Sequence, residues 1–474
     1  MTEPSASPSA QSQPAQSQPA VRQRPHILIV GGGYVGMYTA LRLHKVLRRG
    51  EATITVIDPL SYMTYQPFLP EAAAGNLEPR HVVVPLRRVL PRAQVLNGRV
   101  TRIEHARHIV TFLPNAGEAV EISYDILVVA PGSVARTLPI PGLAECGIGF
   151  KTVGEAIFLR NHVLGKLDIA ASTSNASVRR RALTFVFVGG GYAGVEAFAE
   201  LEDMARDACR SYPTVDPSDM RWVLVEAAGR ILPEVSLDMG EYTVRELQRR
   251  GMEVLLNTRL NSAAGRHIVL SDGQEFDADT LVWTAGVKPN PVVAQSDLPI
   301  DEKGRVKGTA FLTVEGLDDA WVAGDCGAIP DLTNPGKLCG PSAQHAVRQA
   351  KQLGENIAAV LHGREPKEYR HSYSGSVASL GLHKGVAQVY GIKVRGFLAW
   401  FMHRSYHVSR VPTFNRKVRV IADWTLALFF HREIVSLGAL QNPREEFELA
   451  TRPPLPDNAD GGVPRKVASR RPGR

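Results

Sequence analysis

Short apolar runs alternate with longer segments of mixed polarity along most of this chain. The runs at 26–30 and 183–188 are each followed directly by glycines, then by a stretch of helical length, about 36–49 and 194–209. Unbroken apolar runs of this kind are typical of strands that are buried on both faces. A second apolar run then follows each helix, at 53–57 and 222–225. The order strand, turn, helix, strand thus occurs twice and predicts two α/β units.

The segments behind each unit also correspond. Residues 95–110 and 120–122 alternate in polarity, which predicts a meander of antiparallel strands. Two further apolar strands close the units and end in tight turns at Gly132 and Gly286. The glycine turns start 158 residues apart and the closing glycines lie 154 apart. This near-constant offset indicates an internal duplication, so both halves should share one fold.

The two turns have the same glycine spacing. The first contains Gly31, Gly33 and Gly36, and the second contains Gly189, Gly191 and Gly194. Glycines at this spacing, between a strand and a helix, permit a tight turn and let the backbone approach a pyrophosphate at the helix N-terminus. Two copies in the same context predict two dinucleotide sites. Asp58 ends the strand after the first helix, where a carboxylate accepts ribose hydroxyls in such folds.

Composition narrows the class of protein. The length, 474 residues with 44% hydrophobic, suits two or three globular domains. The four cysteines, Cys146, Cys209, Cys326 and Cys339, form no close pair, which argues against a disulfide scaffold, a zinc site or a dithiol centre and indicates a reducing compartment. The first 24 residues lack the apolar core of a signal peptide, and no run is long enough to span a bilayer.

The formal net charge of +8 is unevenly distributed. Between 391 and 422 there are seven Lys or Arg residues and no Asp or Glu, interleaved with aromatic and aliphatic residues that include Phe397, Trp400 and Phe401. This combination is typical of an interfacial helix pair on anionic lipid, and we expect those three residues to contact the membrane. Single-stranded nucleic acid would suit the same residues by base stacking. The two nucleotide-cofactor sites favour lipid, and we expect no nucleic-acid partner.

Several motifs together resemble those of a known family. They are the two glycine turns, the closures Ala130-Pro131-Gly132 and Thr284-Ala285-Gly286, Ala323-Gly324-Asp325, and the Gln-containing helix that follows. They resemble the two-dinucleotide-binding-domain flavoproteins. Within these, the chain most resembles the type II, single-subunit, non-pumping NADH dehydrogenases. The segments that carry this closer resemblance are Gly194-Val195-Glu196, Val225-Glu226-Ala227, Ile231-Leu232-Pro233, Ala285-Gly286-Val287, and 414–420 leading into Asp423-Trp424. The resemblance covers about residues 26–440.

The resemblance implies a set of FAD contacts. Gly31, Gly33, Gly36 and Asp58 would hold the ADP part, with Ala130 and Gly132 from the first closure. Asp325 would bind the ribityl or pyrophosphate region. The helix beginning near Ala343 would direct its positive end at the flavin pyrimidine and stabilise the anionic reduced flavin.

It also implies an NADH site. Gly189, Gly191, Gly194, Glu226 and Gly286 would hold NADH. A carboxylate at 226 accepts ribose hydroxyls and repels a 2′-phosphate, so NADH should be preferred over NADPH, although Arg230 lies close enough in sequence to oppose this. Glu196, in the first turn of the following helix, is a candidate for handling a proton or orienting the nicotinamide.

The acceptor implied by the resemblance is a membrane quinone, menaquinone or ubiquinone. In the family, Ala-Gln and a second Gln one turn later line the quinone slot. Here Ala343-Gln344 matches, but the position four later is Arg348, with Gln349 beside it. Gln344 and Arg348 are therefore the expected quinone contacts. His403 and His407 have a spacing that a metal could use, but no third ligand is nearby, and we expect no metal site.

The complete prediction is an α/β protein with two Rossmann-like domains and a C-terminal membrane-associating region. The expected segments are a disordered tail at 1–24, an FAD domain at 25–147 and 290–364, an NADH domain at 148–289, a membrane-interface region at 365–450 and a basic disordered tail at 451–474. The expected protein is a peripheral NADH:quinone oxidoreductase on the cytoplasmic face of the cell membrane. A homodimer, a soluble NAD(P)H reductase of a protein acceptor, and an NADH sensor with negligible turnover stay open.

Overall fold

Two parallel-stranded sheets form the body of the computed structural model, which describes residues 24–371, 375–430 and 432–438. The first sheet has seven strands, five parallel and then two that continue it as an antiparallel meander. In spatial order they are β20 (Ala320–Val322), β8 (Ile126–Val129), β1 (His26–Val30), β2 (Thr53–Asp58), β5 (Gln94–Glu104), β6 (Ile109–Pro114) and β7 (Val120–Ser123). The apolar run before the first glycine turn is thus a central strand.

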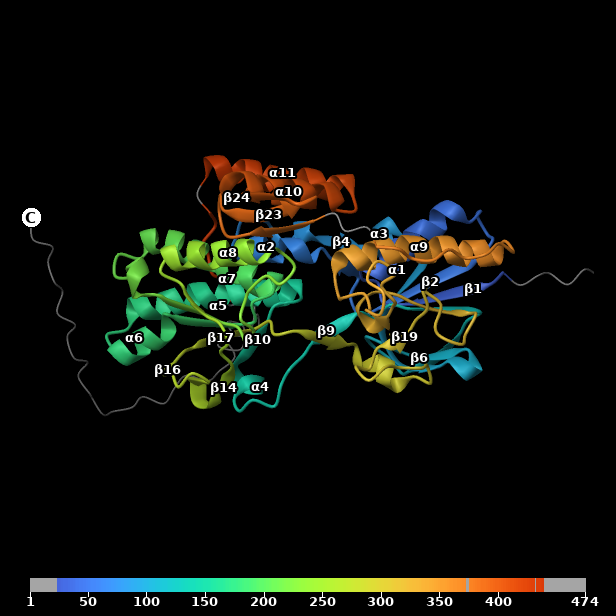
Figure 1. The fold of residues 1–474 in the computed structure, drawn as a ribbon, viewed down its shortest axis with the longest axis horizontal. Helices are drawn as coiled ribbons and strands as arrows, with labels where there is room; N and C mark the ends of the chain where they lie inside the picture. The colour runs from blue at the N-terminus through green and yellow to red at the C-terminus, as the bar shows by residue number, and fades with distance from the viewer. Residues whose placement is uncertain (1–23, 372–374, 431, 439–474) are drawn as a thin grey trace, which may run out of the picture.

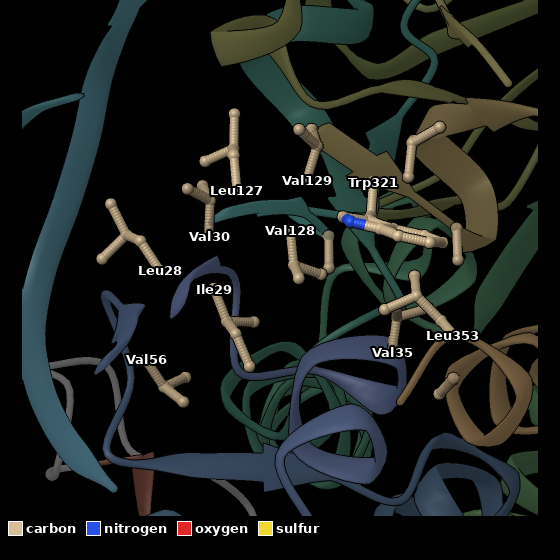
Figure 2. Packing of buried hydrophobic residues seen from close by; sticks show 14 of the residues in the cluster. Leu28, Ile29, Val30, Val35, Val56, Leu127, Val128, Val129, Trp321 and Leu353 are labelled. Atoms are coloured by element: carbon tan, nitrogen blue, oxygen red, sulfur yellow. The ribbon is translucent and has the colours of Figure 1, made fainter. Parts of the chain in front are cut away.

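Helices α1 (Tyr34–Val46) and α9 (Ala343–Leu361) pack together against this sheet. All residues of β8 and β20 are buried, and so are the four apolar residues that follow His26 in β1, as their unbroken apolar sequence predicts. Trp321 on β20 is paired with Val128 on β8 and belongs to the same core as Val35 on α1 and Leu353 on α9 (Figure 2). Burial of these side chains fixes both helices over the strand ends that carry the first glycine turn.

The second sheet has five parallel strands, in the order β10 (Gly147–Gly149), β17 (Thr280–Trp283), β11 (Thr184–Val188), β12 (Arg221–Val225) and β13 (Glu253–Leu255). In this spatial order, each of the five strands corresponds to one of the five parallel strands of the first sheet. Both glycine turns follow the middle strand, and the acidic residues lie at the end of the next one, with Asp58 as the last residue of β2 and Glu226 directly after β12. The predicted duplication of architecture is therefore confirmed.

Helices α5 (Val153–Ser172), α7 (Tyr192–Ala208) and α8 (Leu237–Arg249) accompany the second sheet (Figure 1). The chain passes between the two sheets through β9 (Ser133–Ala135) and β18 (Val287–Pro289), which pair antiparallel. Residues after β18 return to the first sheet as β20, so the first unit is built from two separate parts of the sequence.

The C-terminal region is a third layer. The antiparallel strands β22 (Ser376–Ser379), β23 (Gly385–Val389) and β24 (Ile392–Arg395) precede helices α10 (Gly396–Arg410) and α11 (Phe414–Phe429). Figure 1 shows this layer on one side of the molecule, above α2 (Leu69–Ala73), α7 and α8. It contacts both sheet units, because β22 packs against α7 and His403 of α10 lies against Glu196 of α7, while α11 packs against the segment that follows α2.

The remaining elements are short. They comprise β3 (Tyr62–Thr64), β4 (Val83–Pro85), α3 (Leu86–Val89), α4 (Leu143–Cys146), α6 (Ala176–Ala182), β14 (Leu260–Ser262), β15 (His267–Leu270), β16 (Glu275–Asp277), β19 (Val306–Lys307) and β21 (Gly327–Ala328). Short 3₁₀ helices lie at Gln66–Phe68, Pro79–Val82, His105–Arg107, Cys209–Ser211, Pro217–Asp219, Ala264–Arg266, Pro291–Gln295 and Gly324–Cys326. Within the described ranges, no helix has the length and apolarity needed to cross a membrane. Residues 1–23 of the predicted tail at 1–24, and the whole predicted tail at 451–474, lie outside the described residues.

Candidate functional site

The first glycine turn is held tightly at two glycines and is open at the third. Gly31 has φ +102°, a conformation that L side chains rarely adopt. A Cβ on Gly36 would lie 1.8 Å from the carbonyl oxygen of Gly31, whereas a Cβ on Gly33 would meet nothing within 4 Å. Gly36 is therefore required for the close packing of α1 on the turn, and Gly33 faces open space.

Asp58 stabilises this turn. Its Oδ2 accepts a hydrogen bond from the Gly32 N–H at 2.7 Å, and its Oδ1 accepts one from the Leu60 N–H at 2.7 Å. Burial raises the pKa of Asp58, and the two backbone N–H groups act in the opposite direction. The carboxylate thus lies directly beside the turn, where the sequence predicted a ribose contact.

The second turn repeats this geometry. Gly189 has φ +117°, a Cβ on Gly194 would lie 2.0 Å from the Gly189 carbonyl oxygen, and a Cβ on Gly191 would meet nothing within 4 Å. Glu226 Oε2 accepts a hydrogen bond from the Gly190 N–H at 2.5 Å, as Asp58 does in the first turn. Glu226 thus contacts the second turn as Asp58 contacts the first, so the two turns share one geometry.

A chain of polar side chains links the two units near Gly132. The Lys151 ammonium donates to Ser133 Oγ at 2.5 Å, and Ser133 Oγ donates to Asp325 Oδ2 at 2.5 Å. Burial lowers the pKa of Lys151, which the charges of Asp325 and Glu155 partly oppose. Sequence reasoning found Asp325 but missed Lys151, because it lies outside every motif and is brought there only by folding.

Gln344 and Arg348 lie one turn apart at the start of α9, where Ala343 is the first residue and Ser342 caps the helix. Gln344 Nε2 donates to the Gly375 carbonyl at 2.9 Å, and Arg348 Nη1 donates to Gln344 Oε1 at 3.3 Å. Gln349 turns the other way and accepts from the Gly324 N–H at 2.8 Å. The structure thus brings the two predicted quinone contacts together, whereas the Gln349 side chain binds the turn at Gly324.

Glu196 is buried where α7 meets the C-terminal layer. Its Oε1 accepts a hydrogen bond from the Ser379 N–H at 2.9 Å and lies 3.1 Å from His403 Nε2. The sequence indicated Glu196 but not its partner, since residues 196 and 403 come from different units. His403 therefore faces a carboxylate, and no group of three or more metal-ligating side chains occurs in the described part of the chain.

The prediction that Trp400 contacts a membrane is wrong. Its side chain is only 6% exposed, and its ring stacks on the Arg404 guanidinium, 4.1 Å from the ring centroid. Arg404 in turn pairs with the buried Glu71 of α2 at 2.8 Å, and Glu71 also accepts a hydrogen bond from Trp424 Nε1 at 2.8 Å. Trp400 is thus part of the contact that joins α10 to the first unit.

Phe397 and Phe401 differ from Trp400, since 60% and 55% of these residues are exposed. The outward faces of α10 and α11 carry further exposed apolar residues, namely Leu398, Phe414, Val418, Ile421, Leu426, Leu428 and Phe429. The hairpin of β23 and β24 adds Tyr390 and Ile392. We call this set the apolar face. Such a concentration of large exposed apolar side chains marks an interaction surface.

Comparisons with known proteins agree with this geometry. The model of the pyridine nucleotide-disulphide oxidoreductase family matches residues 25–350. The type II NADH:quinone oxidoreductase of Staphylococcus aureus is 32% identical over 389 residues, with 81% of this chain and 94% of that protein covered. Type II NADH:quinone oxidoreductase Ndh of Mycobacterium tuberculosis is 28% identical over 431 residues, with 88% and 90% covered. The structure of NDH2 from Plasmodium falciparum in complex with NADH has a TM-score of 0.81 at 18% identity, covers 87% of this chain and 100% of that one, and shows a shared fold.

Proposed function

We propose a role in the reaction for each site residue of this chain, which belongs to the pyridine nucleotide-disulphide oxidoreductase family and, within it, to the type II NADH:quinone oxidoreductases. FAD is the resident cofactor and NADH the electron donor. Bound flavin would supply the redox chemistry, by taking a hydride from NADH and passing two electrons to a quinone. The protein's residues bind and orient the reactants and move protons.

The first glycine turn fits the FAD pyrophosphate. Its open position at Gly33 leaves room for phosphate oxygens beside backbone N–H groups, and α1 begins there with its positive end. Asp58 would accept the adenosine ribose hydroxyls. Ala130, Gly132 and Asp325 would line the rest of the cofactor, with α9 directed from Ala343 toward the pyrimidine ring. The repetition of this turn in two units is the observation that carries the proposal, because the reaction needs exactly two dinucleotides.

The second turn would hold NADH through Gly189, Gly191 and Gly194, with Gly286 at the closing strand. Glu226 lies at the place where ribose hydroxyls would bind, and its charge opposes a 2′-phosphate. The Arg230 guanidinium donates to the backbone carbonyls of Leu232 and Val235 and forms no ion pair with Glu226 among the described residues, so it leaves the Glu226 carboxylate available for ribose hydroxyls. We therefore assign a preference for NADH over NADPH.

The quinone would be bound at the start of α9. Gln344 and Arg348 are in contact there, and a guanidinium has five N–H donors for carbonyl oxygens. Arg348 replaces the Gln that the family pattern has at this position, so a charged donor would polarise the quinone more strongly than an amide. Glu196 would serve on the nicotinamide side, either in orienting the ring or in handling a proton.

The apolar face would place the protein on the cytoplasmic face of the membrane, where a quinone is available. Phe397 and Phe401 supply apolar contact, and basic residues of the same helices supply attraction to anionic headgroups. The double variant Phe397→Ser/Phe401→Ser should lose binding to anionic liposomes and keep flavin reduction by NADH. The matched control is Phe311→Ser, a partly exposed Phe far from these helices in the sequence. Equal sedimentation of both variants with liposomes would refute the membrane assignment.

Anaerobic stopped-flow absorbance tests the reaction itself. NADH should bleach the flavin of the purified protein, and menaquinone or ubiquinone analogues should then restore its colour rapidly. Fast bleaching with slow recovery would point instead to a protein acceptor or to a sensor with negligible turnover. Arg348→Gln, which restores the family pattern, should keep bleaching unchanged and alter only the rate of recovery by quinone.

A further inference from the structure

Four buried or nearly buried acidic residues lie on α7, and they differ in their partners. Glu202 pairs with Arg206 and Arg250, and Asp203 pairs with Arg432. Glu196 and Glu200 have no Lys or Arg within ion-pair distance among the residues that the structure describes. Glu200 is completely buried. A carboxylate in such a place is costly when it is ionised, so it tends to hold a proton instead.

Ser379 connects these two residues, which are one helical turn apart. Its backbone N–H donates to Glu196 Oε1 at 2.9 Å, and its hydroxyl donates to Glu200 Oε1 at 2.5 Å. Asn76 Nδ2 lies 3.1 Å from Glu200 Oε2. Every polar atom of Glu200 therefore has a neutral partner, which suits a carboxylic acid as well as a carboxylate.

His403 completes the group on the side of α10. Its side chain is 1% exposed, and Nε2 faces Glu196 Oε1 at 3.1 Å. Both ring nitrogens are buried without a hydrogen-bond partner among the described residues, so the contact of Nε2 with Glu196 is one of ion-pair distance only. The His407 ring lies next to it, 4.5 Å between centroids, and His407 Nδ1 is 3.3 Å from the Tyr65 hydroxyl. Polar groups thus continue from the Glu196–His403 contact toward the first unit.

The surrounding charges set the protonation of this group. Burial raises the pKa of Glu200 to about 7, and Glu71 and Asp203 act in the same direction while Arg432 and Ser379 oppose them. Burial lowers the pKa of His403, but the adjacent Glu196 and the charges of Glu71 and Glu200 outweigh it and leave the pKa raised. Burial and the charge of His403 hold the pKa of His407 well below its usual range. Arg404 pairs with Glu71 at 2.8 Å, so its positive charge lies beside the negative charge of the Glu71 carboxylate.

We infer that Glu200, Ser379, Glu196 and His403 form a buried proton store that supplies the solvent-derived proton of quinone reduction. This inference rests on the proposed function. The overall reaction is NADH plus one proton plus quinone giving NAD⁺ plus quinol. NADH supplies two electrons and one hydrogen, so one further proton must come from solvent in each turnover. The store delivers that proton and is then refilled by one proton from solvent, so that the store itself undergoes no net change.

The location supports this role more than a purely structural one. Glu196 follows the second glycine turn by two residues, so the store begins at the dinucleotide site. Its other end, His403, lies on α10, which bears part of the apolar face, and its Nδ1 has no hydrogen-bond partner among the described residues. A group that only joined these elements would not need two acidic side chains in a region closed to solvent, with Glu196 beside an imidazole and Glu200 held by neutral partners.

The test compares Glu200→Gln with Glu241→Gln, an exposed Glu of the same unit whose side chain is 56% accessible. Infrared spectra across pH detect the carbonyl stretch of a buried carboxylic acid and require no quinone. The unsubstituted protein and Glu241→Gln should show this band, and it should disappear as pH rises through about 7. Glu200→Gln should lack the band. A band of equal size in all three proteins would overturn the inference.

The second readout is the rate at which a quinone analogue reoxidises the NADH-reduced protein. It should fall at least several-fold between pH 6 and pH 8 in the unsubstituted protein, and should be slower and nearly independent of pH in Glu200→Gln. His403→Gln should reduce this rate while flavin bleaching by NADH stays fast. If the unsubstituted protein reduces quinone and Glu200→Gln keeps its pH profile, the store is refuted and the proposed function stands. If no quinone reoxidises the unsubstituted protein, the proposed function fails, and a titrating infrared band then shows a structural acid only.

Discussion

Replacing Arg404 by Met should destabilise the junction between α10 and the first unit by several kcal/mol. The Arg404 guanidinium is nearly buried, pairs with Glu71 at 2.8 Å and lies between the rings of Trp400 and Trp424, 4.1 and 4.8 Å from their centroids. Removal of one partner from a buried ion pair costs about 3–5 kcal/mol, because the remaining charge is left unpaired. Each cation–π contact adds roughly 0.5–2 kcal/mol. Methionine fills much of the volume, so the unpaired Glu71 carboxylate dominates the loss.

The double variant Glu71→Gln/Arg404→Met separates the cost of the unpaired Glu71 charge from the cost of the lost packing. A Gln at position 71 can still accept the Trp424 N–H and carries no charge, so the double variant should lose only about 1–2 kcal/mol. Urea unfolding of the FAD-loaded protein gives the free energies, and hydrogen exchange at residues 396–429 locates the change. As a control, Arg210→Met removes an exposed pair with Asp207 and should stay within about 0.5 kcal/mol. The reasoning fails if Arg404→Met costs less than about 1 kcal/mol, or if the double variant is less stable than the single one.

Three further changes test other parts of the structure. Gly36→Ala would place a Cβ 1.8 Å from the Gly31 carbonyl oxygen, so the purified variant should lack flavin absorbance, and stoichiometric flavin would contradict the assignment of this turn. Glu226→Ala should lower the ratio of kcat/KM for NADH over NADPH by about tenfold, equivalent to about 1.4 kcal/mol, and an unchanged ratio would remove Glu226 from the ribose site. Glu200 binds a proton more tightly in the folded state, with a pKa of about 7 against an ordinary 4.5. Its contribution to stability is therefore present below pH 4.5 and is lost as pH rises to about 7, by at most about 3 kcal/mol. Thermal unfolding of Glu200→Gln should lack this part of the pH dependence, and parallel curves for the two proteins would contradict it.

The sequence was sufficient for the two units and their cofactors because the signals are local. An apolar strand, a glycine turn and a helix occupy consecutive residues, and the steric demand at Gly31 or Gly36 is met within a few positions. Periodicity also predicted the meander that became β5, β6 and β7. The repetition of these signals at a near-constant offset predicted that the two halves share one fold, and the corresponding strand orders of the two sheets agree with this.

Burial in the C-terminal region could not be read in the same way. Composition grouped Phe397, Trp400 and Phe401 as one apolar set, yet Trp400 is inside the protein and the two Phe are outside. Which side of an amphipathic helix is covered depends on what packs against it, and here the partner is α2, more than three hundred residues earlier in the chain. Apolar and basic residues are suited to a membrane surface and to a buried cation–π contact alike, so the composition alone could not separate them.

The sequence alone thus determined the fold class, the two dinucleotide turns and the residues that contact them, since short-range sterics and periodicity specify these. Only the tertiary structure brought Glu196 to His403, Glu200 to Ser379 and Lys151 to Ser133. Each of these pairs joins residues from different units. Their chemistry arises from exclusion of water and from neighbouring charge, which are properties of the packed molecule and not of any segment of the chain.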